Sequence, residues 1–200
     1  MKYLTSFFVL LFLSTKLLAA EPKLHELISS SQIDARLEEV CAKIHTDNEG
    51  RPLCVIAILK GSYMLLADLS KHLTVPHTVD FVKASSYGQR GTKRGGLTLH
   101  EIGTLDIENK DVLLIDDIFD SGVTLSTVVE KLQEKNPRSI KTLVLLSKKV
   151  PKATPYVPNY VLFEIDDHFV IGYGLDFKEY FRNLNGVYIV ENDDFTFFAE

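Results

Sequence analysis

The chain contains the stretch Val112-Leu113-Leu114-Ile115-Asp116-Asp117-Ile118-Phe119-Asp120-Ser121-Gly122-Val123-Thr124, and this stretch decides its fold. The apolar residues that open it have a β-branched bias, which predicts a strand covered on both faces, as in a parallel sheet between helices. A turn of small residues follows, and the segment Val123 to Leu132 then has the periodicity of a helix. The stretch therefore predicts a strand-turn-helix unit with acidic and hydroxyl side chains at the carboxyl end of the strand.

The polar residues of this turn suit a sugar phosphate. Free amides at the start of the helix, together with the hydroxyls of Ser121 and Thr124, can bind a phosphate monoester. Gly122 lets the backbone come close to such a ligand. Asp116 and Asp117 are poor partners for phosphate, but their carboxylates can accept hydrogen bonds from vicinal hydroxyls. Ribose 5-phosphate meets both demands.

A plainer explanation is an ordinary strand-turn-helix unit in which Asp120 or Ser121 caps the helix. Capping accounts for one polar residue of the turn. It does not account for the adjacent acids, the third Asp and the Ser-Gly-x-Thr sequence together.

Composition places the chain among globular proteins with one domain. It has 200 residues, of which 46% are hydrophobic and 24% are charged, and its formal net charge is −5. The acidic balance argues against general nucleic-acid binding, so we expect no nucleic-acid partner. Cys41 and Cys54 are predicted to be buried core thiols, because neither they nor the histidines have the spacing of a metal site.

Residues 1 to 20 differ from the rest of the chain. Lys2 precedes the apolar run Phe7 to Leu13, an order that resembles a secretory signal. Lys16 interrupts the apolar character, and a misassigned start or an unusual extension is the rival explanation. The run is short for a membrane span, so we expect no stable membrane association. We therefore treat residues 1 to 20 as a signal-like extension and residues 21 to 200 as the folded domain.

Other segments alternate between strand and helix patterns. A motif that resembles a capping box, Ser31-Gln32-Ile33-Asp34, precedes an apolar helix face. Asp166 and Asp167 are predicted to be turn residues of a hairpin. Beside the central unit we expect a helix from Tyr63 to Leu73 and strands over Leu53 to Leu59, Val79 to Tyr87, Leu99 to Thr104, Ile140 to Leu146, Tyr160 to Ile165, Phe169 to Tyr173 and Val187 to Val190. The alternation predicts one α/β domain with a small accessory hood and a glycine-rich hairpin loop from Gly88 to Leu97.

The order of residues from Val112 to Thr124 resembles the phosphoribosyl-pyrophosphate (PRPP) signature of the type I phosphoribosyltransferases. Segments Leu59 to Tyr63, Ser86 to Gly88 and Val170 to Leu184 are similar to the hypoxanthine-guanine branch of that family, and the resemblance runs from about Leu24 to Val190. It implies the family's α/β fold, with a mainly parallel sheet flanked by helices, a small hood and a flexible lid hairpin. Residues 21 to 200 would then be the phosphoribosyltransferase domain.

The resemblance also implies an activity. The enzyme would belong to purine salvage, transferring the 5-phosphoribosyl group from PRPP to hypoxanthine or guanine and releasing IMP or GMP and pyrophosphate. Mg²⁺ would be its cofactor, the cytoplasm its location, and a homodimer or tetramer its assembly.

Each matched residue takes a role from the family. The ribose and 5′-phosphate would be bound by Asp116, Asp117, Asp120, Ser121, Gly122, Val123 and Thr124. Asp120 would also accept the proton of the purine N7 during catalysis, and its rival role is to cap the following helix.

The pyrophosphate group would be held by Lys60, Gly61 and Arg182. The family often has a cis peptide in this loop, which here would be the bond between Leu59 and Lys60. The planar guanidinium of Arg182 suits such an anion, although a surface ion pair with Glu179 would explain that arginine equally well.

The purine would be bound by Lys148, Phe169, Val170 and Asp176. Lys148 would donate to the 6-oxo group, so adenine would be rejected, while Phe169 would stack on the base and the Val170 backbone would bind its edge. Phe169 could equally be a core aromatic residue. Asp176 would also be the metal ligand. Ser86 and Tyr87 would belong to the lid that excludes water.

Other functions remain open on the sequence. Xanthine is an alternative base. A PRPP-sensing regulator that binds nucleic acid is a second alternative, and a periplasmic or lipid-associated protein on the same fold, suggested by residues 1 to 20, is a third.

Overall fold

The computed structural model describes residues 23–86 and 97–190. Its main body is a sheet of six strands in the order β4-β3-β2-β5-β6-β7. One helix joins β2 to β3 and another joins β5 to β6, whereas residues 149–159 join β6 to β7 without a helix. The bounds are β2 Leu53–Leu59, β3 His77–Ser86, β4 Leu97–His100, β5 Asp111–Phe119, β6 Ser139–Lys148 and β7 Tyr160–Ile165. Only β4 runs antiparallel to its neighbour in this sheet, pairing with β3.

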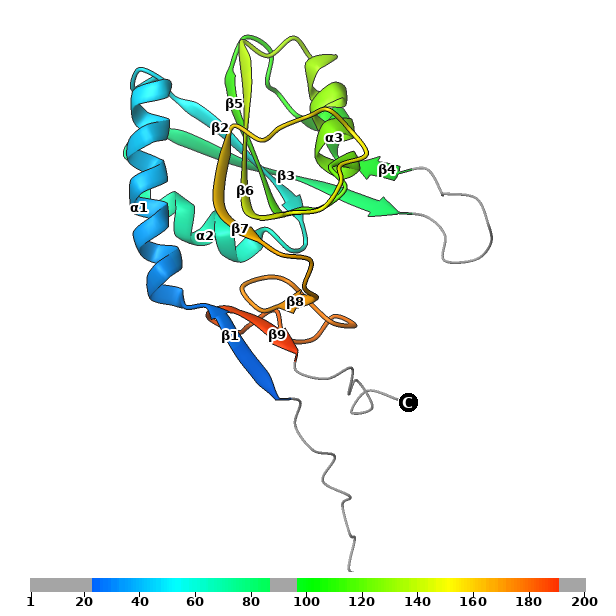
Figure 1. Cartoon of the computed structure of the whole chain (residues 1–200). Helices are drawn as coiled ribbons and strands as arrows, with labels where there is room; N and C mark the ends of the chain where they lie inside the picture. The colour runs from blue at the N-terminus through cyan, green and yellow to red at the C-terminus, as the bar shows by residue number, and fades with distance from the viewer. Residues whose placement is uncertain (1–22, 87–96, 191–200) are drawn as a thin grey trace, which may run out of the picture.

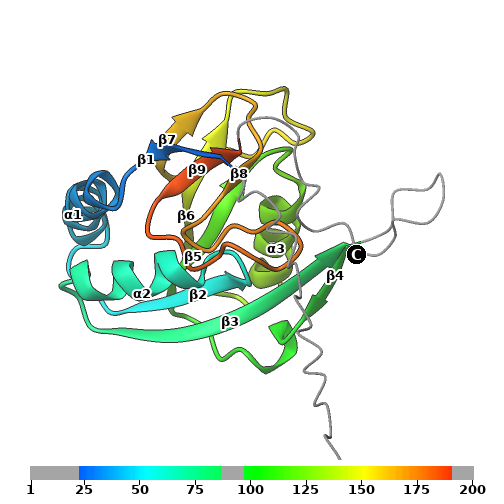
Figure 2. The ribbon, with the colours of Figure 1, turned by 90° about the horizontal axis from the view of Figure 1, so that it is seen from below.

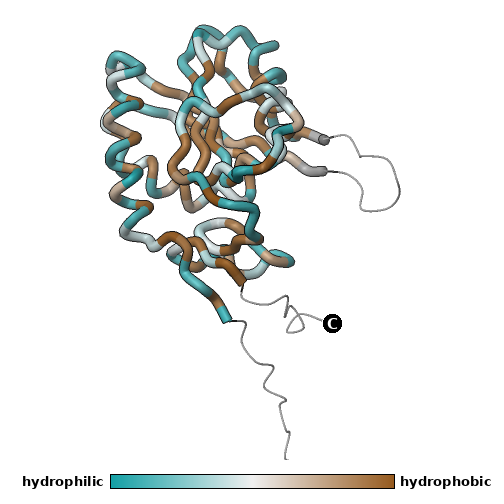
Figure 3. Tube along the Cα trace, in the orientation of Figure 1, coloured by the Kyte–Doolittle hydropathy of each residue, from teal (hydrophilic) through white to brown (hydrophobic). Residues whose placement is uncertain are grey.

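Helices cover both faces of the main sheet (Figures 1 and 2). Helices α1 (Ser30–Asp47) and α2 (Tyr63–His72) pack with Val55 and Ala57 of β2 in one core cluster. Helix α3 (Val123–Gln133) packs with Ile56 of β2 in the other. Alternate residues of a strand point to opposite faces, so the continuous apolar sequence of β2 supplies both clusters. Figure 3 shows the corresponding concentration of hydrophobic residues along the central strands.

A second, smaller sheet forms the hood. It has the strand order β1-β9-β8, with β1 at Leu24–Ile28, β8 at Val170–Ile171 and β9 at Val187–Val190. All its pairs are antiparallel, and Leu24 pairs with Val190. Figure 1 shows this sheet below the main one. The predicted α/β fold with a mainly parallel sheet and a small hood is confirmed.

Strand β1 was not predicted from the sequence. Its five residues are too few for a clear alternating pattern, and its partner is the last described strand of the chain. Short edge strands of this kind form because a distant partner is present.

The capping box lies two residues earlier than predicted. Ser29 is the N-cap of α1: its hydroxyl accepts from the Gln32 amide at 3.3 Å, and its own amide donates to Gln32 Oε1 at 2.9 Å. The predicted box over residues 31 to 34 is therefore wrong. Strand β1 ends at Ile28, so the helix begins directly after it.

Two strand predictions were too long, and one connection was wrong. Strand β4 stops at His100 because Glu101 adopts a φ of 72°, and a 3-10 helix, η1 (Ile102–Thr104), replaces the rest of the predicted strand. Strand β8 stops at Ile171, where Gly172 has a φ of 91°. Strands β7 and β8 belong to different sheets, so the acids between them are not hairpin-turn residues.

No helix in residues 23–86 and 97–190 is both long and apolar enough to cross a membrane. The predicted signal-like extension, residues 1 to 20, lies outside the described residues.

Candidate active site

A cavity of about 320 Å³ opens where β2 and β5 end. Ligand sites in α/β sheets lie at such carboxyl edges, where neighbouring strands lead into helices. The wall combines the loop after β2 with the turn after β5. The lining residues are Ile58, Leu59, Lys60, Gly61, Ala84, Asp116, Asp117, Ile118, Phe119, Asp120, Ser121, Gly122, Thr124 and Leu125. The structure thus brings together eight of the predicted site residues, from Lys60 and Gly61 to Thr124.

The paired acids sit near the carboxyl end of β5. Asp116 is buried, and its Oδ1 accepts from the Asp117 amide at 3.0 Å. Burial and the neighbouring charge of Asp117 raise the pKa of Asp116 well above its usual range. Burial also raises the pKa of Asp117, and the positive charge of Arg182 partly offsets this rise. Asp116 is buried and Asp117 is partly buried, so the two carboxyls resist ionising together, and their oxygens can form hydrogen bonds with sugar hydroxyls.

The turn after β5 leaves its polar groups facing the cavity. Gly122 is the N-cap of α3 with a φ of 84°, and no side chain caps this helix. The rival role of Asp120 as a helix cap is therefore wrong, and its exposed side chain lines the cavity. Ser121 Oγ lies 3.5 Å from the Val123 amide, a distance too long for a strong cap. Uncapped amides at the start of a helix are the groups that bind phosphate.

The loop after β2 is fitted closely against these acids. The peptide bond between Leu59 and Lys60 is cis, as predicted. A Cβ added to Gly61 would lie 1.4 Å from Asp117 Oδ2. A Cβ added to Gly174, in the hood, would lie 1.9 Å from the Gly61 carbonyl oxygen. Backbone of the hood, backbone of this loop and a carboxylate of β5 are thus stacked with no room for further atoms.

Arg182 forms the ion pair with Glu179 that was its alternative role, and it also contacts Asp176 and the Gly174 carbonyl. Its Nη2 lies 2.8 Å from Asp176 Oδ1 and 3.2 Å from Glu179 Oε2. Its Nη1 donates to the Gly174 carbonyl at 2.8 Å. Its Nε is buried and has no partner among the described residues. The guanidinium holds two carboxylates through Nη2, although Arg182 is not among the residues that line the cavity.

The predicted purine-binding residues, Lys148, Phe169, Val170 and Asp176, are not among the residues that line the cavity. Lys148 ends β6, and its Nζ forms an ion pair with Asp167 Oδ1 at 2.9 Å. Phe169 is 51% exposed, so it is not a core aromatic residue. Its ring meets that of Phe177 edge to face, with the centroids 5.9 Å apart. Val170 is buried in β8.

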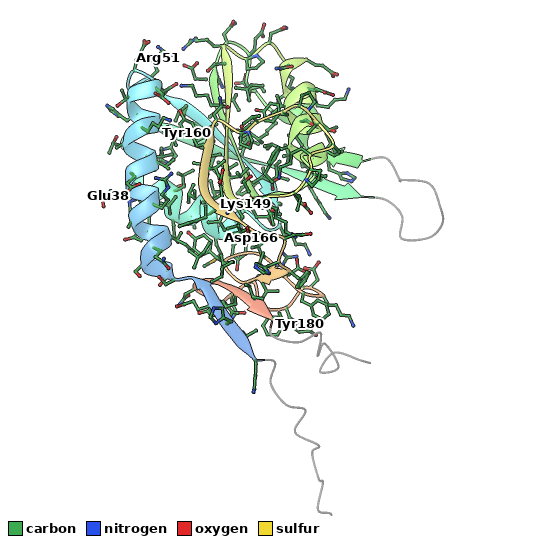
Figure 4. The ribbon with its side chains drawn as sticks, in the orientation of Figure 1. Glu38, Arg51, Lys149, Tyr160, Asp166 and Tyr180 are labelled. Atoms are coloured by element: carbon green, nitrogen blue, oxygen red, sulfur yellow. The ribbon has the colours of Figure 1, made fainter. Side chains whose placement is uncertain are left out.

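The chain between β7 and β8 is tied to the end of β6 by two ion pairs. Besides the pair between Lys148 and Asp167, Lys149 Nζ lies 3.5 Å from Asp166 Oδ1. Figure 4 shows Lys149 and Asp166 between the main sheet and the hood. The acids that were predicted as turn residues therefore connect the segment between β7 and β8 to the end of β6.

Several contacts that position the site were not found from the sequence. Lys152 Nζ donates to the carbonyls of Phe119 at 3.2 Å and Lys148 at 2.5 Å, which joins the end of β5 to the end of β6. Tyr173 of the hood donates to Asp68 Oδ2 of α2 at 2.8 Å. The only sequence signals were a basic residue in a proline-rich loop and an acid on a helix, and both are common.

The predicted lid is placed only in part. Ser86 is the last residue of β3. Tyr87 and the loop that follows it lie outside the described residues.

Comparison with known proteins identifies the family. Residues 27–178 match the model of the phosphoribosyl transferase domain. A hypoxanthine-guanine phosphoribosyltransferase of Aquifex aeolicus (strain VF5) is 37% identical over 171 residues, which cover 85% of this chain and 96% of the relative. One of Staphylococcus aureus (strain Mu50) is 38% identical over 160 residues, which cover 79% of this chain and 88% of the relative.

Solved structures agree with the sequence comparison. The crystal structure of a hypoxanthine-guanine phosphoribosyltransferase from Bacillus anthracis has a TM-score of 0.78 at 36% identity, covering 86% of this chain and 100% of that chain. Hypoxanthine phosphoribosyltransferase from Trypanosoma cruzi, in complex with the product IMP, has a TM-score of 0.77 at 33% identity, covering 87% and 97%. The chain described here belongs to the phosphoribosyl transferase domain family.

Proposed function

We propose that this protein is a purine salvage enzyme that transfers the 5-phosphoribosyl group of PRPP to hypoxanthine or guanine, yielding IMP or GMP and pyrophosphate. The observation that carries the proposal is the cavity where an acid pair, uncapped helix amides and the Lys60–Gly61 loop meet. Relatives named hypoxanthine-guanine phosphoribosyltransferase support the choice of bases.

The sugar phosphate is assigned to the end of β5 and the start of α3. Asp116 and Asp117 accept from the ribose hydroxyls. The 5′-phosphate is bound by the amides from Ser121 to Thr124 and by the two hydroxyls of that segment. The backbone supplies most of these donors, so Gly122 and Val123 contribute without charged side chains.

Asp120 is assigned the proton step. Its exposed carboxylate lines the cavity beside the phosphate turn, so a base bound above the ribose can present its N7 to it. An ordinary carboxylate is a weak base near neutral pH, so its contribution comes from position and from its charge beside a cationic transition state.

Pyrophosphate is assigned to Lys60, Gly61 and Arg182. The Nη2 of Arg182 already holds the carboxylates of Asp176 and Glu179, so this guanidinium can bind an anion that arrives with the substrate. Lys60 and Arg182 supply the positive charge, and Gly61 belongs to the loop that lines the cavity.

The donor set also fits Mg²⁺. The described residues contain no group of three or more His, Cys, Asp and Glu side chains placed to hold a metal. Mg²⁺ would be held by one carboxylate, that of Asp176, whose oxygens contact Arg182 Nη2 and the Glu179 amide, with substrate oxygens and water as the remaining ligands. The ion, when bound, neutralises charge on the leaving pyrophosphate.

The base is assigned to the hood side of the cavity. Lys148 donates to the 6-oxo group, Phe169 stacks on the ring, and the backbone at Val170 with Asp176 meets the ring edge. A lysine donor finds no acceptor on the 6-amino group of adenine, which gives the expected preference.

One assay tests the proposal. The full chain is supplied with PRPP and Mg²⁺ and with hypoxanthine, guanine, xanthine, adenine or uracil, and nucleotide formation is measured. We expect IMP or GMP as the main product, with adenine and uracil unused. Preferential formation of the xanthine nucleotide would replace the assigned base, and no product with any base would contradict the enzyme assignment. Size-exclusion chromatography with light scattering tests the proposed dimer or tetramer.

A further inference from the structure

The carboxylate of Glu179 lies between the two cations that are assigned to pyrophosphate. Its Oε2 is 2.9 Å from Lys60 Nζ and 3.2 Å from Arg182 Nη2. Lys60 belongs to the loop after β2, whereas Glu179 and Arg182 lie between β8 and β9 of the hood. One acidic side chain therefore joins both halves of the anion site.

The contacts of this carboxylate are those that an oxygen of pyrophosphate would make. An anionic oxygen placed between an ammonium group and a guanidinium group neutralises both. A glutamate carboxylate is charged at neutral pH, and the hydrogen bonds from Lys60 and Arg182 lower the pKa of Glu179 further. We infer that Glu179 is an internal substitute for the pyrophosphate anion, which holds Lys60 and Arg182 in the empty site and leaves when PRPP binds.

The three side chains differ in how firmly they are held. Glu179 and Lys60 are 63% and 56% exposed, so their bridge is of the weak, solvent-screened kind. Arg182 is 18% exposed and is also held by Asp176 and by the Gly174 carbonyl. Glu179 can therefore move into solvent while Arg182 keeps its place.

The backbone around Glu179 is unusual. Lys178, Glu179 and Phe181 have φ values of 49°, 72° and 70°. Residues other than glycine rarely adopt this left-handed backbone conformation. The Glu179 amide donates to Asp176 Oδ2 at 2.8 Å. The turn thus anchors the glutamate to the proposed metal ligand and aims its side chain at Lys60.

This inference rests on the proposed function. It predicts opposite effects of Glu179 on PRPP binding and on pyrophosphate release. The cost is weaker PRPP binding, because the substrate must displace a carboxylate. The benefit is faster release of pyrophosphate, because the carboxylate can return as the product leaves. Glu179 is a positioning residue, since it acts through Lys60 and Arg182.

The test is calorimetric titration of the full chain with inorganic pyrophosphate in the presence of Mg²⁺. E179Q keeps the size of the side chain and removes its charge, and we expect its Kd for pyrophosphate to fall about three- to tenfold. E179D keeps the charge but shortens the reach, and we expect an intermediate Kd. E38Q is the matched control, because Glu38 is an exposed glutamate on the outer side of α1 (Figure 4), and its Kd should equal that of the wild type.

Steady-state kinetics supply a second measurement. In E179Q the KM for PRPP should fall by a similar factor, the KM for the base should not change, and kcat should not rise. A role that is only structural would raise both KM values instead. E179D carries the test if E179Q does not fold.

Unchanged or weaker pyrophosphate binding in the Glu179 variants, with a wild type that binds pyrophosphate and forms nucleotide, would overturn this inference alone. A wild type that neither binds pyrophosphate nor forms nucleotide would overturn the proposed function together with it.

Discussion

Asp120 and Gly174 show how single residues determine what the cavity can do. Asp120 presents a carboxylate to the cavity and does not cap helix α3. Gly174 has no side chain, so the hood can touch the loop after β2. A substitution of Asp120 should affect the chemical step, and a substitution of Gly174 should affect the shape of the site. The two effects can be measured separately.

Asp120→Asn keeps the size and polarity of the side chain and removes its charge and basicity. We expect kcat to fall by about 10²-fold or more, as for the loss of a general base, with the KM for PRPP within about threefold of the wild type. Steady-state rates with hypoxanthine and saturating PRPP provide the measurement. An unchanged kcat would remove Asp120 from the proton step.

Gly174→Ala places a methyl group 1.9 Å from the Gly61 carbonyl oxygen at a residue with a φ of 98°. The clash must displace either the loop or the hood, so we expect a loss of about 2 kcal/mol or more in stability and a higher KM for PRPP. Gly103→Ala is the control, because its added Cβ would have no atom within 4 Å. Urea unfolding measures both, and equal losses for the two variants would contradict the steric argument.

At the scale of elements, strand β5 is the feature that the sequence describes best. Its apolar run, its acid pair and the start of α3 follow one another along the chain, so local pattern was enough to predict them. The contacts that complete the site were beyond such reasoning. The pair between Lys60 and Glu179 spans 119 positions, and the bond between Tyr173 and Asp68 spans 105. Such pairs are set by how β2, α2 and the hood pack, not by any local signal.

The buried carboxyl of β5 makes the stability of the fold depend on pH. Because burial and the charge of Asp117 raise the folded-state pKa of Asp116, its ionisation opposes folding once the pH exceeds the ordinary value of 3.8. Asp116→Asn should therefore raise the melting temperature near pH 7, and the gain should vanish in acid below that value. The same variant should bind PRPP more weakly, as expected when a site trades stability for function. Thermal melts across this pH range test the sign, and a gain that persists in acid would contradict it.

At the scale of the molecule, the main sheet and the hood meet around the cavity. The fold class and the family were predicted correctly from the sequence. The predicted site residues from β2 and β5 line one cavity, but their roles, and those of Lys148, Phe169, Val170, Asp176 and Arg182, stay predictions. The hood was predicted, but its strand order was not, because β1 and β8 are short and depend on β9 for their pairing.

The joint between the two sheets can be weakened without touching the cavity lining. Tyr173→Phe removes the buried hydroxyl that binds Asp68 of α2, and we expect a loss of about 0.5–1.5 kcal/mol in stability. Tyr188→Phe removes a hydroxyl that binds Glu26 at the exposed edge of the hood, at 3.1 Å, and should cost less. Hydrogen exchange at β8 and β9 would report the loosened hood in the first variant. Equal effects of the two changes would argue against Tyr173 as a tie between the sheets.

The pairing of Leu24 with Val190 has a consequence for biosynthesis. A ribosome delivers β1 early and β9 late, so the nascent chain can assemble its central sheet while the hood still lacks its middle strand. The hood sheet is then the last part of the fold to be completed. Arrest of translation before residue 187 would leave a nascent chain in which β1 and β8 lack the strand that pairs with both.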